Sequence, residues 1–163
     1  YGKTKLAGEK ALQEIMPTDA IIIRTSWLYS EFGNNFVKTM LRLGKERDEI
    51  NVVSDQIGSP TYATDLANAI LEIIDNKDYQ DKQQSTEIYH YSNEGEISWY
   101  EFAKEIFKIA EVNCKVNPIT TQQYPTPAKR PRNSLIDSNK IMQLFDINTP
   151  FWKDSLKRIF TND

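Results

Sequence analysis

Residues 20–29 read AIIIRTSWLY, a short apolar run that is rich in β-branched side chains. A run of this length and composition is typical of a strand buried on both faces, as in parallel sheets. Helical periodicity lies on each side of it, over residues 2–16 and 34–47. A buried strand between two helices predicts right-handed β-α-β crossovers and therefore an α/β fold.

The alternation of strands and helices continues to the end of the chain. Further strands are predicted at residues 49–55, 87–93 and, more weakly, 115–121. Further helices are predicted at residues 64–75, 98–111, 139–145 and 151–160. Three connections complete the pattern: a loop with glycine and proline as turn residues, a polar exposed stretch suited to insertions, and a proline-rich irregular stretch, at residues 56–65, 76–85 and 122–134.

Side chains that cap helices stand at several predicted helix starts. Asn34 or Asn35 precedes the second helix, and Thr64 or Asp65 stands at the start of the third. Ser98 is followed three residues later by a glutamate, which is the spacing of a capping box.

The composition excludes several classes of function. The chain has 163 residues, of which 39% are apolar and 26% charged, so a folded domain is favoured over disorder. No apolar run approaches the roughly 20 residues of a membrane span, and no secretory leader follows residue 1. The net charge is −3 and the basic residues are scattered along the chain, so the sequence shows no basic patch of the kind that binds nucleic acid.

The cysteine and histidine content narrows the choice further. The single cysteine, Cys114, rules out an internal disulfide and fits a reducing, cytoplasmic compartment. We interpret it as a semi-buried small side chain rather than a nucleophile. The single histidine, His90, lies in a predicted strand, so a histidine-rich metal site is excluded and no metal is predicted.

A tyrosine and a lysine four residues apart occur twice on predicted helices, as Tyr1 with Lys5 and as Tyr100 with Lys104. The spacing places phenol and ammonium on one helix face, but chance alone gives roughly 0.7 such matches in a chain of this composition. Tyr100 follows a capping box on an amphipathic helix, whereas Tyr1 and Lys5 precede the run at residues 20–29. We therefore single out the first pair.

The chemistry that uses such a pair is carbonyl reduction. A free phenol, with a pKa of ~10, is a slow proton donor at neutral pH, and a nearby ammonium lowers the pKa of a phenol. The same ammonium can hold a cofactor hydroxyl. The glycine-rich turn of dinucleotide-binding domains is missing from the chain, so either this is not a nucleotide enzyme or the first half of its sheet lies upstream of residue 1.

Four stretches together carry a family resemblance: YGKTKLAGE, RTSWLYSEFGNNFVKTML, VVSDQIGSPTYATDLA and PTPAKRPRNSLID, at residues 1–9, 24–41, 52–67 and 125–137. They resemble the dTDP-4-dehydrorhamnose reductases, a branch of the extended short-chain dehydrogenase/reductase family. The resemblance runs from residue 1 to the last helix in the same order.

The resemblance implies a reductase that uses NADPH or NADH. Its substrate would be a dTDP-linked 4-keto-6-deoxy sugar, dTDP-4-dehydro-L-rhamnose, which is reduced to dTDP-L-rhamnose for bacterial surface polysaccharide. Tyr1 matches the family's proton donor to the keto oxygen. Lys5 matches the lysine that activates this tyrosine and binds the nicotinamide ribose, so both residues are expected to contact the cofactor.

The resemblance also implies residues that bind the substrate. Trp27 matches a residue that contacts the sugar nucleotide, and Arg130 and Asn133 match a stretch near the nucleotide-sugar site. Asn35 matches an asparagine near the substrate diphosphate, and a helix N-terminus suits an anion on independent grounds. Without the resemblance, Trp27 would fit a core aromatic residue equally well, and the basic cluster around Arg130 would be read as a solvated loop.

The resemblance divides the chain. Residues 1–50 would be the end of a Rossmann-like domain and residues 51–163 mainly the substrate-binding part, with the strand at 87–92 returning to the Rossmann-like sheet. The family's glycine-rich turn and catalytic serine or threonine come before the tyrosine. The chain is therefore expected to be the C-terminal portion of the fold and to be inactive alone.

Two rival readings stay open. Relatives with this fold include non-catalytic regulatory subunits, such as the β subunit of methionine adenosyltransferase. A reductase of another nucleotide-linked 4-keto sugar is the second rival. A homodimer is a further expectation. Asp55 and Gln56, beside Gly58 and Pro60, are read as turn formers.

Overall fold

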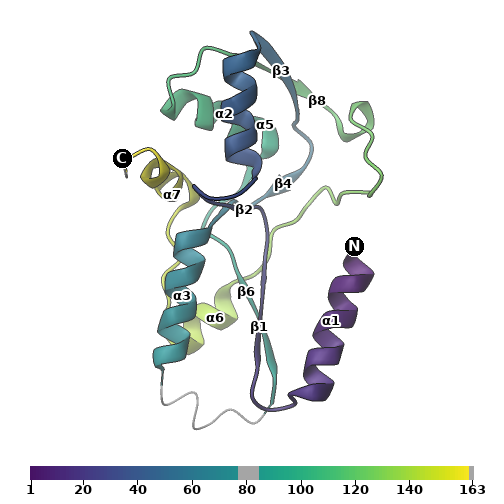
Figure 1. Ribbon diagram of the computed structural model, residues 1–163, viewed down its shortest axis with the longest axis vertical. Helices are drawn as coiled ribbons and strands as arrows, with labels where there is room; N and C mark the ends of the chain where they lie inside the picture. The colour runs from purple at the N-terminus through teal and green to yellow at the C-terminus, as the bar shows by residue number, and fades with distance from the viewer. Residues whose placement is uncertain (77–84, 162–163) are drawn as a thin grey trace.

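The computed structural model describes residues 1–76 and 85–161 (Figure 1). The predicted polar connection at residues 76–85 lies almost entirely outside the described residues. The helices are α1 (Gly2–Ile15), α2 (Phe36–Glu46), α3 (Ala63–Asp75), α5 (Trp99–Ile109), α6 (Asn139–Phe145) and α7 (Trp152–Ile159), with one short 3₁₀ turn, η1 (Thr121–Gln123). The strands are β1 (Ile21–Thr25), β2 (Leu28–Tyr29), β3 (Glu49–Val53), β4 (Ile57–Gly58), β5 (Thr61–Tyr62), β6 (Glu87–Tyr91), β7 (Ile97–Ser98) and β8 (Lys115–Ile119).

The described strands form four pairs, and most of the pairing is parallel. β1 pairs with β6, β2 with β5, and β3 with β8 in parallel, whereas β4 and β7 are antiparallel. The two longest pairs begin with Ile21 opposite Glu87 and with Glu49 opposite Lys115. Helices lie between the strands of both of these pairs in the sequence, so the predicted α/β class and its parallel crossovers are confirmed.

The β1–β6 pair lies between helices on its two sides. α3 and α6 lie on one side and α1 lies on the other (Figure 1). Apolar residues from α3, β6 and α6 form one core, which includes Ile73, Tyr89, Tyr91, Ile141 and Phe145. α1 contributes no buried residue.

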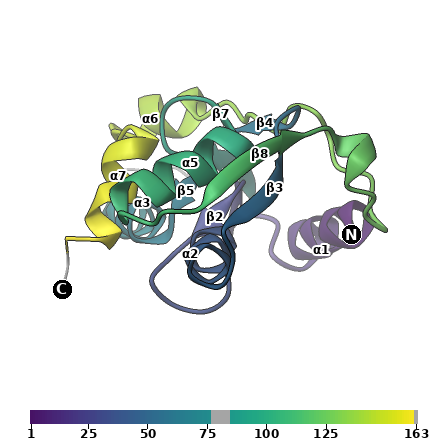
Figure 2. The same ribbon diagram turned by 90° about the horizontal axis from the view of Figure 1, so that it is seen from above.

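A second core lies around the β3–β8 pair, against which α2 and α5 pack, as Figure 2 shows from above. It contains Val37 and Met40 from α2, Ile50 and Val52 from β3, and Phe102 from α5. Residues of α7 close it from the C-terminal side. Among the described helices, none combines the length and the hydropathy that crossing a membrane requires.

Two of the three predicted helix caps are confirmed. Asn35 caps α2, because its Oδ1 accepts a hydrogen bond from the backbone N–H of Lys38 at 3.2 Å. Ser98 and Glu101 form the capping box of α5, each side chain accepting a hydrogen bond from the other residue's backbone N–H at 3.1 Å. These caps are fixed by local sequence, which is why the pattern found them.

The predicted cap of α3 is wrong. Tyr62 holds the cap position without a side-chain hydrogen bond, and Asp65 is turned inward and is only 4% exposed. Its carboxylate accepts hydrogen bonds from Asn93 Nδ2 at 2.7 Å and Ser155 Oγ at 2.6 Å, and it pairs with Arg158. Asp65 joins α3 to the end of β6 and to α7, because a buried carboxylate needs such partners.

The stretch at residues 20–29 is not one strand. It forms β1 and β2, separated at Ser26 and Trp27, where Trp27 adopts a left-handed φ of 49°. The prediction of burial on both faces is also wrong: the first three residues of β1 are half-buried, and Arg24 and Thr25 are exposed. Among the described strands β1 pairs only with β6, and α1 buries none of its own residues.

The predicted loop at residues 56–65 contains two short strands and the start of α3. β4 pairs with β7, and β5 pairs with β2 through Leu28 opposite Thr61. Gly58 therefore lies in a strand rather than in a turn. Strands of two residues are too short to show a period-2 pattern, so the sequence carried no signal for them.

Candidate active site

Tyr1 and Lys5 lie together at the start of α1. Lys5 Nζ is 5.9 Å from the centroid of the Tyr1 ring, and the backbone N–H of Lys5 donates to the Tyr1 carbonyl at 3.1 Å. The Tyr1 side chain is 87% exposed. In both views this end of α1 lies toward the irregular stretch that follows β8 (Figures 1 and 2). The phenol and the ammonium thus lie on one open helix face.

The second tyrosine–lysine pair has nearly the same internal geometry. Lys104 Nζ lies 5.2 Å from the centroid of the Tyr100 ring on α5. Tyr100, however, is half-buried and packs against the core around β3 and β8. The surroundings distinguish the two pairs, whereas the spacing does not.

An ion pair holds α1 against β1. Arg24 Nε donates to Glu9 Oε1 at 2.8 Å, and its terminal nitrogen donates to Oε2 at 2.6 Å. This two-point contact holds the pKa of the Glu9 carboxyl below its usual range, mainly through the hydrogen bond from Arg24. Because α1 has no buried residue, this pair is an important constraint on where Tyr1 and Lys5 lie.

Trp27 lies at the break between β1 and β2, and its indole is stacked on Trp99 of α5. The ring centroids are 3.4 Å apart and the planes differ by 8°. Trp27 Nε1 donates to Ser134 Oγ at 2.9 Å, and the ring of Phe36 lies 4.4 Å from that of Trp99. The fold therefore brings Trp27 together with the stretch at residues 130–134, both of which the family resemblance places near the sugar nucleotide.

The stretch at residues 130–134 is held by β4. Ile57 N–H donates to the Arg132 carbonyl at 2.8 Å, and Ser134 N–H donates to the Ile57 carbonyl at 2.9 Å. Asn133 is exposed, and its Oδ1 accepts from the backbone N–H of Leu135 at 2.8 Å. Arg130 is exposed on the loop. Solvent thus reaches Arg130 while the backbone beside it is fixed.

The stretch at residues 130–134 ends a loop that begins at Thr121, and Asp55 and Gln56 hold the Thr121 end of this loop. Asp55 Oδ1 accepts hydrogen bonds from the backbone N–H of Thr121 at 2.8 Å and from its hydroxyl at 2.7 Å. Gln56 Nε2 donates to the same hydroxyl at 3.1 Å. The hydrogen bonds from Thr121 hold the pKa of Asp55 below its usual range. Residues 55–57 thus fix both ends of the loop.

Sequence reasoning assigned Asp55 and Gln56 to a turn and missed this role. Both residues bond across 65 or more positions of sequence, and no local pattern indicates such partners. The one available signal was the order of residues: two polar side chains directly before a strand, and a proline-rich basic stretch far downstream.

Asn35 is engaged by the backbone around it. Its Oδ1 caps α2 as described, and its Nδ2 donates to the Ser30 carbonyl at 2.7 Å. The next residue, Phe36, packs near Trp99. The side chain therefore holds the loop before α2. The first backbone N–H groups of α2, which have no partner within the helix, lie close to the cluster formed by the rings of Trp27, Phe36 and Trp99.

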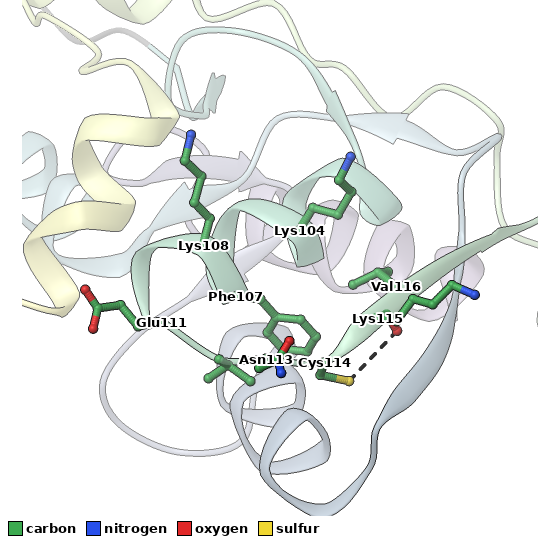
Figure 3. Close-up of a pocket in the computed structure, with 9 residues that line it drawn as sticks. Lys104, Phe107, Lys108, Glu111, Asn113, Cys114, Lys115 and Val116 are labelled. Atoms are coloured by element: carbon green, nitrogen blue, oxygen red, sulfur yellow. Dashed lines mark hydrogen bonds between the residues drawn. The ribbon is translucent and has the colours of Figure 1, made fainter.

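A surface pocket of about 560 Å³ lies between α5 and the start of β8, apart from these residues (Figure 3). Cys114, Phe107 and Val116 line it, and Lys104 and Lys108 extend away from Cys114. Burial raises the pKa of the Cys114 thiol, which keeps it protonated and unreactive. None of the residues predicted to act on substrate or cofactor lines this pocket.

The arrangement defines a class of protein: an α/β fold of the extended short-chain dehydrogenase/reductase type, with the helix of Tyr1 leading into a parallel strand. More narrowly, the chain belongs to the RmlD substrate binding domain family, whose model matches residues 1–163.

Individual relatives agree with this assignment. The chain is 48% identical to the dTDP-4-dehydrorhamnose reductase of Aggregatibacter actinomycetemcomitans, over 98% of this chain and 55% of the relative. It is 43% identical to that of Escherichia coli strain K12, over 98% of this chain and 54% of the relative. The chain thus spans about half the length of the curated relatives it matches.

A solved structure gives the same result for the fold. The dTDP-4-dehydrorhamnose reductase of Bacillus anthracis strain Ames, in complex with NADP, is 44% identical and superposes with a TM-score of 0.87. The match covers 99% of this chain and 54% of that one. The predicted family and fold class are confirmed.

Proposed function

We propose that this chain is the substrate-side portion of an NADPH- or NADH-dependent reductase that converts dTDP-4-dehydro-L-rhamnose to dTDP-L-rhamnose. The names of the relatives support the reaction, and the NADP bound to the Bacillus anthracis reductase supports the cofactor. One observation in the chain carries the proposal: Trp27 and Ser134, 107 positions apart, are hydrogen-bonded. The fold thereby joins two stretches for which the resemblance implies one ligand.

The residues present fit a nicotinamide cofactor beside α1. Lys5 is exposed and makes no ion pair within 4 Å among the described residues, so its ammonium is free to donate to ribose hydroxyls. The phenol of Tyr1 lies on the same face and is open. A bound nicotinamide supplies the hydride for carbon 4 of the sugar.

The chain's own residues donate the proton and bind the substrate. The Tyr1 hydroxyl donates its proton to the keto oxygen as that oxygen becomes an alcohol, and the Lys5 ammonium stabilises the phenolate that is left. Arg130 offers a fork of N–H donors to the diphosphate, and Trp27 and Asn133 line the sugar-nucleotide side. Asn35 places the start of α2 near the same diphosphate, where unpaired backbone N–H groups favour an anion.

The chain provides a matched control for a test of Tyr1. In the full-length protein, Tyr1→Phe is expected to lower kcat about 10²-fold or more, because it removes the general acid. Tyr100→Phe, in the pair of similar geometry, is expected to leave kcat within about twofold. Both rates are measured as oxidation of NADPH and of NADH in the presence of the keto sugar.

The result separates the proposal from its rivals. A Tyr1→Phe rate within a few-fold of the wild type would show that the proton donor is wrong. Binding of dTDP-rhamnose without turnover in the wild type would favour the regulatory-subunit reading. Turnover of a different nucleotide-linked 4-keto sugar, with none of the rhamnose precursor, would replace the substrate but keep the chemistry.

Several coarser expectations belong to the same proposal. We place the protein in the cytoplasm, which is supported by its single, buried, free cysteine. The division into residues 1–50 and 51–163 is supported by the pairing of β1 with β6, which returns the strand at 87–92 to the first part. A homodimer is supported by three exposed apolar side chains that lie together on α3, Ile70, Leu71 and Ile74.

A further inference from the structure

Gly58 lies against the indole of Trp27. A Cβ at position 58 would lie 2.4 Å from Cε2 and 2.7 Å from Cζ2 of Trp27, and 2.6 Å from Oγ of Ser134. Real Cβ atoms essentially never approach another heavy atom within 3.0 Å. Gly58 is not among the residues with positive φ. A glycine is therefore required here for space, not for backbone conformation.

The two faces of the indole are covered by different groups. Cε2 is a ring-fusion carbon that is bonded to three other ring atoms, all in the plane of the indole. A Cβ whose shortest contact is with Cε2 must therefore lie above or below that plane, against one face of the ring. The other face is occupied by Trp99, whose ring is nearly parallel at a centroid distance of 3.4 Å. Trp27 is thus clamped between the backbone of β4 and a second indole.

The remaining freedom of the ring is removed by a hydrogen bond. Trp27 Nε1 donates to Ser134 Oγ, and that hydroxyl donates in turn to the Ile57 carbonyl at 3.0 Å. The backbone of Trp27 has φ 49°, a left-handed conformation that costs energy for a residue other than glycine. Such backbone strain persists only where the surrounding structure holds the residue in place. It gives the Trp27 side chain a different direction from the one that a continuous strand would give it.

We propose that Gly58 and Ser134 are positioning residues for Trp27, and that Trp27 meets its ligand with the C–H rim of the indole rather than with a ring face. The inference rests on the proposed function for its ligand, a dTDP-linked sugar. An aromatic rim carries partial positive charge, whereas a face is negative. The rim therefore suits the oxygen atoms of a sugar or a diphosphate, and stacking on the thymine base is blocked.

The test compares two glycines in the full-length protein. Gly58→Ala inserts a methyl group against Trp27, whereas Gly44→Ala on α2 inserts one at a similar depth against Val112 and Phe107, at 2.7 and 2.8 Å. Ser134→Ala is a milder change, which adds no atoms and removes the hydrogen bonds of the Ser134 hydroxyl to Trp27 and to the Ile57 carbonyl. The stacked indoles are followed by their exciton signal in circular dichroism, and the Trp27 indole N–H by ¹⁵N NMR. Affinity for dTDP-rhamnose is measured by calorimetry.

We expect Gly58→Ala to reduce the exciton signal strongly and to weaken binding of dTDP-rhamnose about tenfold or more, since displacement of a positioned group by about 1 Å has effects of this size. Ser134→Ala should shift the Trp27 N–H resonance and weaken binding several-fold. Gly44→Ala should lower stability but preserve both the signal and the affinity.

Two results would overturn the inference: a full exciton signal in Gly58→Ala, or a lost signal with the affinity of the wild type. A wild type that binds no dTDP-rhamnose would instead overturn the proposed function. In that case the exciton signal and the N–H resonance still decide whether Gly58 and Ser134 fix the indole.

Discussion

Thr121 donates two hydrogen bonds to a single carboxylate oxygen of Asp55, from its backbone N–H at 2.8 Å and from its hydroxyl at 2.7 Å. The two residues are 66 positions apart. Their contact closes the base of a loop whose other end is paired with Ile57. The loop contains Arg130, so the contact between Asp55 and Thr121 helps to hold the segment whose guanidinium is proposed to bind phosphate.

Replacing Thr121 tests whether this closure matters for binding. Thr121→Val removes the hydroxyl but keeps the backbone donor, so the loop should open more often. We expect trypsin to cut after Lys129 several-fold faster and dTDP-rhamnose to bind several-fold more weakly. Thr126→Val is the control, because the Thr126 hydroxyl bonds to Ala128 within the loop itself. Equal proteolysis of the two variants would contradict the role of the Asp55 contact.

The same contact predicts a pH dependence. The pKa of Asp55 is held below its usual range by the hydrogen bonds from Thr121. A depressed carboxyl pKa contributes stability that is present above the ordinary aspartate value of ~3.9 and is lost as pH falls through the lowered pKa. Cleavage of the loop by pepsin, measured relative to cleavage of an unfolded peptide at the same pH, should therefore rise more steeply below about pH 3.9 in the wild type than in Asp55→Ala.

The Glu9–Arg24 pair should decide how well α1 is held. Glu9→Gln removes the charge that makes the two-point contact strong, so α1 amides should exchange with deuterium several-fold faster. In the full-length protein kcat should fall more than the affinity for dTDP-rhamnose, because Tyr1 lies on α1. The control is Glu46→Gln, which breaks an exposed pair with Arg42 within α2. If both variants exchanged equally, α1 would have other constraints.

Asp65 should be the most costly of the polar residues to lose. Asp65→Ala leaves Asn93 and Ser155 without their buried acceptor, and the expected loss of stability is about 3 kcal/mol in urea unfolding. Asp154→Ala, which breaks an exposed pair with Lys157, should cost less than about 1 kcal/mol. A similar cost for the two variants would mean that the network around Asp65 adds no stability.

Asn35 allows a structural role to be separated from a binding role. Asn35→Ser keeps an oxygen that can cap α2, and Asn35→Ala does not, so the alanine variant should be less stable by about 1 kcal/mol. If Asn35 acts on the diphosphate only through the helix start, Asn35→Ser should bind dTDP nearly as tightly as the wild type. A large loss of affinity in the serine variant would show that the amide itself contacts the ligand.

The sequence predicted those features whose causes are local. Asn35 and Ser98 cap their helices as expected, because a cap needs only a polar side chain and the next three residues. The α/β class also followed, since alternating periodicities leave few other arrangements.

The predictions that were wrong concern features that depend on residues far away in the sequence. Asp65 has the residue type and position of a cap, yet partners on β6 and α7 draw it inward. Gly58 fits a turn, but the space that it leaves is filled by Trp27, 31 positions earlier. Nothing within a few residues of these positions distinguishes the two outcomes.

The pairing of the strands has a consequence for how the chain folds. Among the described strands, none pairs with its neighbour in sequence, and the longest pairs join Ile21 to Glu87 and Glu49 to Lys115. The described residues contain no hairpin that could nucleate a sheet early. The entropy cost of closing a long loop must therefore be met before any strand pair stabilises the chain. During synthesis, β3 remains unpaired until residue 119 has emerged from the ribosome. The capped helices α2 and α5 are therefore the segments able to gain structure first, and the sheets are expected to form last.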